Sequence, residues 1–232
     1  PIEQLKGKGT IYGCNAIYRD HPDLCDKIFA VNEDMHAELV EAKQKNKFTA
    51  DVIGAEDISS WNYILDNDDP GTIPDGLKLY RQWQGGDAKR GVYKTRDFSL
   101  NRGSGCSAVL HAAEQGFRDI VILAFDILGA RQWEITDGSA SRLQNNVYAD
   151  TANYPARHSM KAYMKYEWLY HLTQTFRRFP NINFYFINRR EYIEQNPYLR
   201  HYFRYAPGNI KTGIYADLKR YMDGDSITWT SY

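Results

Sequence analysis

The sequence predicts an α/β protein with a doubly wound, mainly parallel sheet, helices on both faces and a long irregular lid-like loop. Short apolar runs alternate along the chain with stretches of helical periodicity, which is the pattern of repeated strand–helix units. The run at residues 119–125 is apolar almost throughout, as expected for a strand buried on both faces of a parallel sheet. A length of 232 residues fits a single domain.

Charge and hydropathy narrow the class of protein. The chain has 29 Lys and Arg against 29 Asp and Glu, so it offers no basic field for phosphate backbones, and nucleic acid is not expected as the main partner. The longest clean apolar run, residues 120–125, is far shorter than a membrane-spanning helix, and the first residues lack the apolar stretch of a signal peptide. We therefore expect a cytoplasmic protein without a membrane span.

Cysteine and aromatic content add two further indications. The three cysteines are odd in number and have neither zinc-ligand nor disulfide-framework spacing, so we expect all of them to be reduced. Aromatic residues make up 14% of the chain, and 18 of them are tyrosine. Tyrosine combines an apolar body with a polar tip, which suits sites that hold sugars or bases and suits plain interfaces equally.

The first part of the chain predicts two strands and a helix. Residues 10–14 and 28–31 are short β-branched, aromatic or apolar runs that indicate buried strands, joined by a connection that contains Pro22. Residues 33–47 place apolar side chains on one helical face, with acidic residues early and lysines late. This distribution of charge agrees with the dipole of a helix.

An irregular insertion is expected at residues 61–95, where proline and glycine recur every few positions. It contains the sequence Asp66-Asn67-Asp68, which matches the Asp-x-Asp pattern that holds a divalent ion in many nucleotide-sugar transferases. Because no clear strand precedes it and it lies in a Pro/Gly turn, we expect a solvated acidic turn here rather than a metal site.

Two strand–helix units follow. A glycine turn leads into a helix at residues 106–115, which Gly116 ends, and the strand at 119–125 comes next. A long helix at residues 159–179 then precedes a strand at 182–187. This order of glycine turn, helix and parallel strand indicates the doubly wound arrangement.

Two further segments lie outside these units. Residues 127–158 connect the two units, and a long irregular connection inside a compact domain is typically a lid or a binding segment. Residues 192–232 form a tyrosine-rich tail that could pack against neighbouring molecules or a second copy of the chain.

Candidate binding residues lie where the predicted elements meet. Ser104 and Gly105 stand at a helix N-terminus, where free backbone N–H groups suit a phosphate or carboxylate, but a tight turn into the helix explains them equally. Asp126 ends the buried strand, at the edge where open α/β sheets bind ligands; it could also simply cap the following turn.

His158 is the sharpest catalytic candidate. It precedes Ser159 at the predicted N-terminus of a long helix, where the helix dipole disfavours the imidazolium and keeps the ring neutral and able to accept a proton. The alternative is an ordinary surface or capping histidine. The other five histidines show no metal-ligand spacing, and no metal site is expected.

The chain resembles the bacterial sialyltransferases that use CMP-sialic acid, together with the related glycosyltransferases of bacteria and phages. Four segments in family order support the resemblance: YGCNAIY at residues 12–18, FAVN at 29–32, Ser104-Gly105 followed by the strand and acid at 119–126, and RHS at 157–159. The resemblance implies a Rossmann-like fold and a cytoplasmic enzyme of a bacterium or a phage-infected cell.

Site roles follow from the resemblance residue by residue. Asn15 and Asn32 look like the asparagines that contact the nucleotide and sugar, Ser104 and Gly105 like the turn that meets the donor, and His158 like the general base. The implied reaction is a metal-independent, inverting transfer from a nucleotide-activated sugar to an acceptor hydroxyl, without a cofactor.

This chain departs from the family pattern in two places. The phosphate-binding tyrosine of the family is replaced here by Leu128, and Tyr148 and Tyr154 are candidates to take over its role. The opening Gly-x-Gly-Pro-Ser motif of the family is not found among these 232 residues.

Two other classes of protein stay open. The missing motif and the tyrosine-rich tail favour a catalytically inactive Rossmann-like structural or interaction protein, for example a phage virion component. A weaker alternative is a phosphate- or pyrophosphate-transferring enzyme on the same fold. Fold-level analogy does not decide between them.

Overall fold

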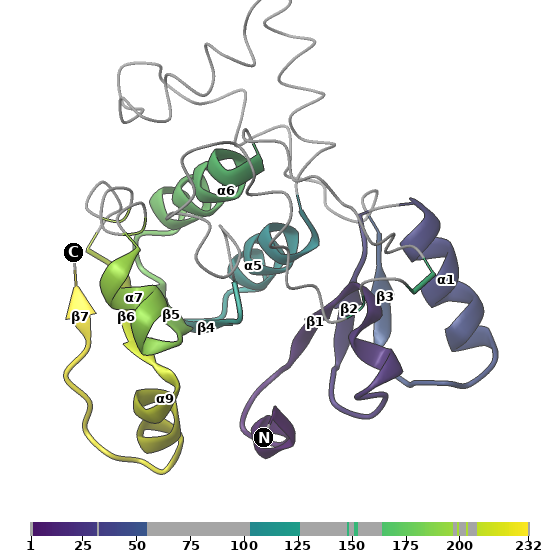
Figure 1. Ribbon diagram of the computed structural model, residues 1–232, viewed down its shortest axis with the longest axis horizontal. Coiled ribbons are helices and arrows are strands. Elements are labelled where there is room, and N and C mark those ends of the chain that lie inside the picture. Colours follow the sequence, from purple (N-terminus) through teal and green to yellow (C-terminus); the bar gives the residue numbers. More distant parts are fainter. Residues whose placement is uncertain are drawn as a thin grey trace, which may run out of the picture.

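The computed structural model describes residues 2–31, 33–54, 103–125, 148, 151–152, 164–196, 199, 203 and 208–231. Here helices alternate with strands, and every neighbouring pair of strands except the last is parallel (Figure 1). The predicted α/β class with mainly parallel strands is confirmed. No helix in these ranges is long and apolar enough to cross a membrane. The insertion at 61–95 lies outside the described residues, as does most of the connection at 127–158.

The N-terminal sheet contains three parallel strands in the order β1-β2-β3. Its elements follow the chain as η1 (Ile2–Leu5), β1 (Tyr12–Cys14), η2 (Asn15–Arg19), β2 (Lys27–Phe29), α1 (Glu33–Gln44) and β3 (Asp51–Ile53). Gly13 is in register with Ile28, and Ile28 with Val52. The first two strands and helix α1 are where the sequence predicts them.

As far as the structure describes it, the C-terminal sheet has the order β4-β5-β6-β7, in which β7 runs antiparallel to β6. Its elements are α5 (Ser104–Glu114), β4 (Asp119–Leu123), α6 (Met164–Arg178), β5 (Asn183–Asn188), α7 (Arg190–Gln195), β6 (Ile210–Ile214), α9 (Tyr215–Met222) and β7 (Thr230–Ser231). Among its described residues, the stretch predicted as a tyrosine-rich tail contains β6, α9, β7 and most of α7. Tyr192 of this stretch is a core residue that is 1% exposed.

The strands thus form two sheets among the described residues, where the sequence predicts one. Periodicity identifies strands but not their partners. Within the described part of the chain, β1 pairs with β2 alone and β4 with β5 alone. Helix α5 lies between the sheets and packs against both (Figure 1). Its small residues Ala112 and Ala113 lie in the core of the C-terminal sheet, whereas Ala108 and Leu110 pack with Phe29 of β2.

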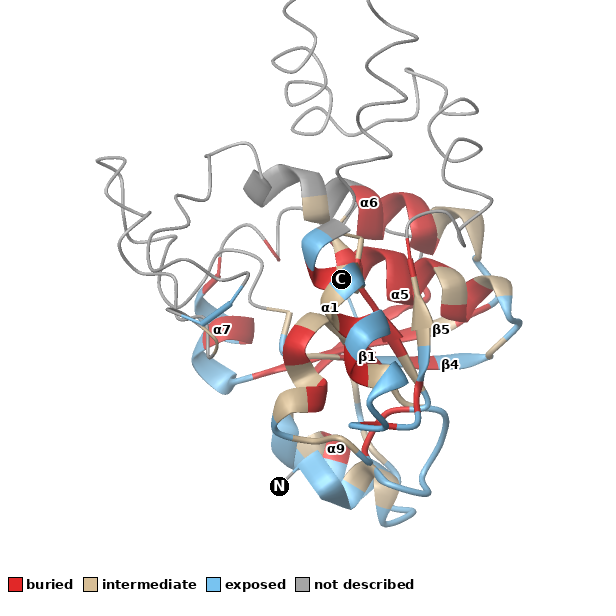
Figure 2. Ribbon diagram, turned by 90° about the vertical axis from the view of Figure 1, so that its right-hand side faces the viewer, coloured by how far each residue is buried: buried red, intermediate tan, exposed pale blue. Residues whose placement is uncertain are grey.

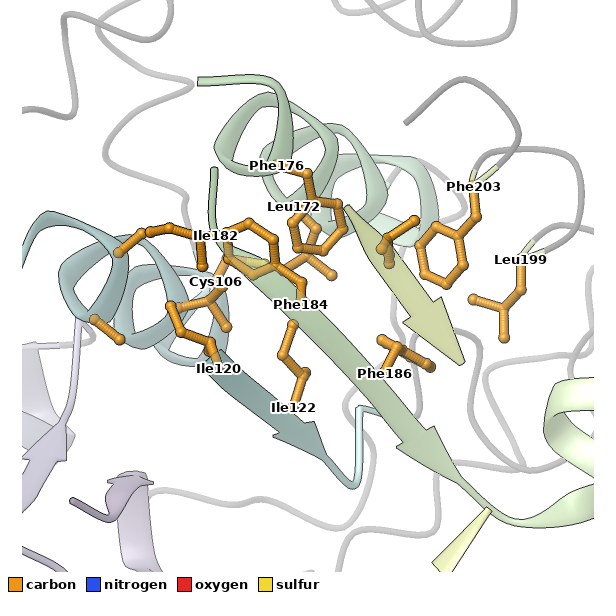
Figure 3. Packing of buried hydrophobic residues seen from close by; sticks show 14 of the residues in the cluster. Cys106, Ile120, Ile122, Leu172, Phe176, Ile182, Phe184, Phe186, Leu199 and Phe203 are labelled. Atoms are coloured by element: carbon orange, nitrogen blue, oxygen red, sulfur yellow. The ribbon is translucent and has the colours of Figure 1, made fainter. Parts of the chain in front are cut away.

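Helices cover both faces of each sheet, as predicted. Helix α1 packs its buried residues against Ile28 on one face of the N-terminal sheet, and α5 covers the other face. Side chains of β5 alternate between faces. Phe184 and Phe186 lie in one cluster with residues of α6 (Figure 3), and Tyr185 and Ile187 lie in another cluster with Leu218 of α9. Buried residues concentrate along α5 and α6, whereas α9 is largely exposed (Figure 2).

A buried asparagine joins three elements of the C-terminal half. The Asn209 Nδ2 lies 3.3 Å from the carbonyl oxygen of Phe176, 2.9 Å from that of Phe179 and 2.9 Å from that of Ile182. These carbonyls belong to the end of α6 and the turn before β5, where helix geometry leaves acceptors without partners. The amide of Asn209 thus closes the C-terminus of α6 onto the start of β6.

Candidate functional site

The carboxyl ends of β1, β2 and β4 meet at the N-terminus of α5. In the N-terminal sheet, successive strands are added in the order β1, β2, β3, and in the C-terminal sheet in the order β4, β5, β6. Strands β1 and β4 are therefore the two starting points from which the sheets extend. In open α/β folds, ligands bind outside the carboxyl ends of strands at such a point. This edge is therefore the candidate site.

The Ser104 hydroxyl joins these ends. It donates a hydrogen bond to the Asn15 Oδ1 at 2.9 Å and accepts one from the Val31 backbone N–H at 3.2 Å. Asn15 directly follows β1 and has a φ of 56°, in the left-handed region that asparagine tolerates better than most residues. Two residues predicted from distant motifs are thus in direct contact.

These contacts determine what the site offers a ligand. The Asn15 Oδ1 accepts the hydrogen bond from Ser104, and this contact assigns which end of the side-chain amide is oxygen and which is nitrogen. The amide nitrogen Nδ2 is then left as a donor, and it has no partner among the described residues. The first intrahelical bond of α5 runs from the Ser107 N–H to the Gly103 carbonyl, so the N–H groups of Ser104 and Gly105 precede it. The site presents hydrogen-bond donors, which suit an anion.

Close packing also explains why residue 105 is a glycine. A Cβ atom at this position would lie 2.5 Å from Cζ of Phe125, so the ring of Phe125 occupies the space that a side chain would need. The Phe125 carbonyl oxygen in turn accepts a hydrogen bond from the Asn188 Nδ2 at 3.3 Å. Glycine is therefore required for the end of β4 to approach α5 closely.

Asn188 is a residue of this edge that the sequence analysis missed. It is 1% exposed, and besides the contact with Phe125 its Oδ1 accepts a hydrogen bond from the Arg189 N–H at 2.8 Å. These bonds tie the carboxyl ends of β4 and β5 together. The sequence carries a signal for it, because Asn188 is a polar residue directly after the apolar run predicted as a strand at 182–187, the same pattern that indicates Asp126.

Tyr148 lies elsewhere. Its ring packs against the core of the N-terminal sheet, and the Arg19 guanidinium carbon is 5.8 Å from the ring centroid. The structure therefore places Tyr148 beside η2 and α1, on the side of the N-terminal sheet that carries α1.

Four predicted site residues, Asn32, Asp126, Tyr154 and His158, lie outside the described residues. Two of them directly follow described residues of the candidate site, since Val31 precedes Asn32 and Phe125 precedes Asp126. The Asp-x-Asp motif at 66–68 is also outside. Among the described residues, no group of three or more His, Cys, Asp or Glu side chains could hold a metal ion.

Two thiols of the N-terminal sheet and its core are predicted to be unreactive. Burial and the Asp26 carboxylate raise the pKa of Cys25 to about 11, and burial and the nearby Cys25 raise that of Cys14 to about 12. Only the thiolate is alkylated, so at pH 8 we expect both to react at least about 100-fold more slowly in the native protein than in the denatured chain, where a thiol pKa is about 8.5. Iodoacetamide labelling with peptide mass mapping measures this.

The same shifts affect stability. The folded protein holds these thiol protons more tightly than the unfolded chain, so this contribution to the free energy of unfolding is complete below about pH 8.5. It is lost as pH rises toward the native pKa values. Native-state labelling of Cys25 at the denatured rate would contradict the assignment.

Comparison of the chain with protein-family models, curated proteins and solved structures finds no match in any of the three.

Proposed function

We propose that the chain is a Rossmann-like glycosyltransferase that moves a sugar from a nucleotide-activated donor to an acceptor hydroxyl, with the donor phosphate bound at the N-terminus of α5. The observation that supports this most directly is the Ser104–Asn15 contact, which leaves the Asn15 Nδ2 and the helix N–H groups as donors at one edge. A nucleotide sugar brings acceptor oxygens in its phosphates and sugar hydroxyls. The ordered motifs of the sequence agree with this class of ligand.

The proposed reaction needs a base and a stabilised leaving group. The acceptor hydroxyl oxygen attacks the anomeric carbon, its proton passes to His158, and the bond from that carbon to the phosphate oxygen breaks with its electron pair on the departing nucleotide. Donors at the α5 N-terminus stabilise that developing negative charge. Attack from the side opposite the leaving group inverts the configuration, and no metal ion takes part in these steps.

Nucleotide binding tests the proposal. Calorimetric titration of CMP, UDP, GDP and their sugar conjugates, with and without divalent ions, should show saturable binding of one nucleotide. Asn15→Asp keeps an oxygen to accept from Ser104 but replaces the Nδ2 donor by a negative oxygen. We expect the affinity for that nucleotide to fall at least about tenfold, the value of one lost hydrogen bond to a charged group.

Asn46→Asp is the matched control. Asn46 also has a left-handed backbone, with a φ of 54°, but it is exposed beyond the end of α1. The same substitution there should leave the affinity unchanged. An Asn15→Asp protein that binds as tightly as the wild type would remove Asn15 from the site, and silence of the wild type across the whole panel would favour the inactive scaffold.

A further inference from the structure

Arg19 of η2 connects two parts of the chain that are far apart in sequence. Its guanidinium donates to both carboxylate oxygens of Glu38 in α1, with N–O distances of 2.6 to 2.9 Å. The same group donates to the Thr151 Oγ1 at 2.7 Å and to the Ala152 carbonyl oxygen at 3.0 Å. One side chain therefore holds α1 on one side and residues 151–152 on the other.

The ion pair between Arg19 and Glu38 is largely buried and is supported by a further hydrogen bond. The side chains of Arg19 and Glu38 are only 21% and 19% exposed, and the Tyr18 hydroxyl donates to the same carboxylate at 2.6 Å. A planar guanidinium that donates three hydrogen bonds to one carboxylate is fixed in direction. Its remaining N–H groups are then aimed at the Thr151 and Ala152 oxygens.

The segment that Arg19 contacts has its own turn. The Thr151 N–H and Oγ1 both donate to the Tyr148 carbonyl oxygen, at 3.1 and 2.6 Å, and the ring of Tyr148 lies beside the Arg19 guanidinium. Tyr148, Thr151 and Ala152 thus meet Arg19 through an aromatic face, a hydroxyl and a backbone carbonyl respectively. A single arginine side chain therefore makes all three kinds of contact with this segment.

We propose that Arg19 is a positioning residue that attaches the connection between β4 and α6 to the N-terminal sheet through Tyr148, Thr151 and Ala152. Its importance for the reaction rests on the proposed function, because that connection also contains Tyr154 and His158. Arg19 itself touches no reacting atom in this assignment; it sets where the connection is attached.

Hydrogen exchange of the whole chain measures the attachment. The Thr151 N–H is hydrogen-bonded to Tyr148 and reports on the turn. In Arg19→Ala we expect exchange in peptides covering 148–152 to be at least about tenfold faster, while peptides from β4 and β5 exchange as in the wild type. Arg19→Lys should have the same effect, because a single ammonium cannot hold Glu38, Thr151 and Ala152 together.

Arg190→Ala is the matched control, since Arg190 also pairs with a glutamate, Glu194, but both side chains are more than half exposed. This variant should leave exchange at 148–152 unchanged. Unchanged exchange in a folded Arg19→Ala protein would overturn the proposal. If Arg19→Ala raises exchange throughout the chain, the Arg19→Lys variant provides the test instead. Exchange at the wild-type rate in peptides covering 148–152 of Arg19→Lys would then overturn the proposal. Absence of nucleotide binding by the wild type would defeat the proposed function without altering this result.

Discussion

Phe184→Ala is expected to lower the free energy of unfolding by about 3–5 kcal/mol, the range for a buried phenylalanine cut back to alanine. Phe184 is the second residue of β5 and is fully buried, and its ring centroid is 4.6 Å from that of Phe176 on α6 (Figure 3). The substitution removes this ring pair and leaves a cavity between sheet and helix. Equilibrium unfolding in urea, followed by circular dichroism, measures the loss.

Val121→Ala on the adjacent strand is the control, because Val121 is 37% exposed and should lose less than about 1 kcal/mol. A loss of about 5 kcal/mol can exhaust the stability of a small domain. Phe184→Leu, which fills part of the cavity, then gives the smaller measurable shift. A Phe184→Ala protein within about 1 kcal/mol of the wild type would show that the α6–β5 packing contributes little.

The accuracy of the fold prediction followed the strength of the local signal. Strands β4 and β5 stand out as apolar runs and were predicted, whereas β3 has three residues and begins with Asp51. Strand β6 contains Gly213, which normally argues against a strand. The reason for this glycine is the Trp229 ring, 2.7 Å from where a Cβ would lie. Such a reason comes from tertiary packing and is absent from the local pattern.

In the candidate site, too, local features could be predicted from the sequence and contacts between distant segments could not. Strand ends and a helix N-terminus are local features, so Asn15 and Ser104 could be selected from sequence, and the structure brings them to 2.9 Å. Which polar groups bond one another is decided by the packing of distant elements. The contact between Ser104 and Val31 and the bonds of Arg19 to residues 151–152 each join segments that no periodicity relates.

His158→Ala is expected to lower the rate of sugar transfer about 10²- to 10⁴-fold, the usual contribution of a general base. The prediction depends on the proposed function and on sequence, since His158 lies outside the described residues. A base acts in its deprotonated form, so kcat/KM of the wild type should fall as pH drops below the pKa of the imidazole. Product formation from the nucleotide sugar that binds best, measured against pH, gives both quantities.

In His158→Ala the fall of kcat/KM at low pH, the acid limb of the pH profile, should disappear together with most of the transfer rate. The reason is that no group remains that must lose a proton before the acceptor hydroxyl attacks. Added imidazole should restore part of the rate, while nucleotide affinity stays at the wild-type value, since the donor phosphate is assigned to Asn15 and the α5 N-terminus. His21→Ala provides the control: His21 pairs with Glu3 at 3.0 Å, and its loss should change neither rate nor pH profile. A His158→Ala enzyme with the full rate and an intact acid limb would assign the proton transfer to another group.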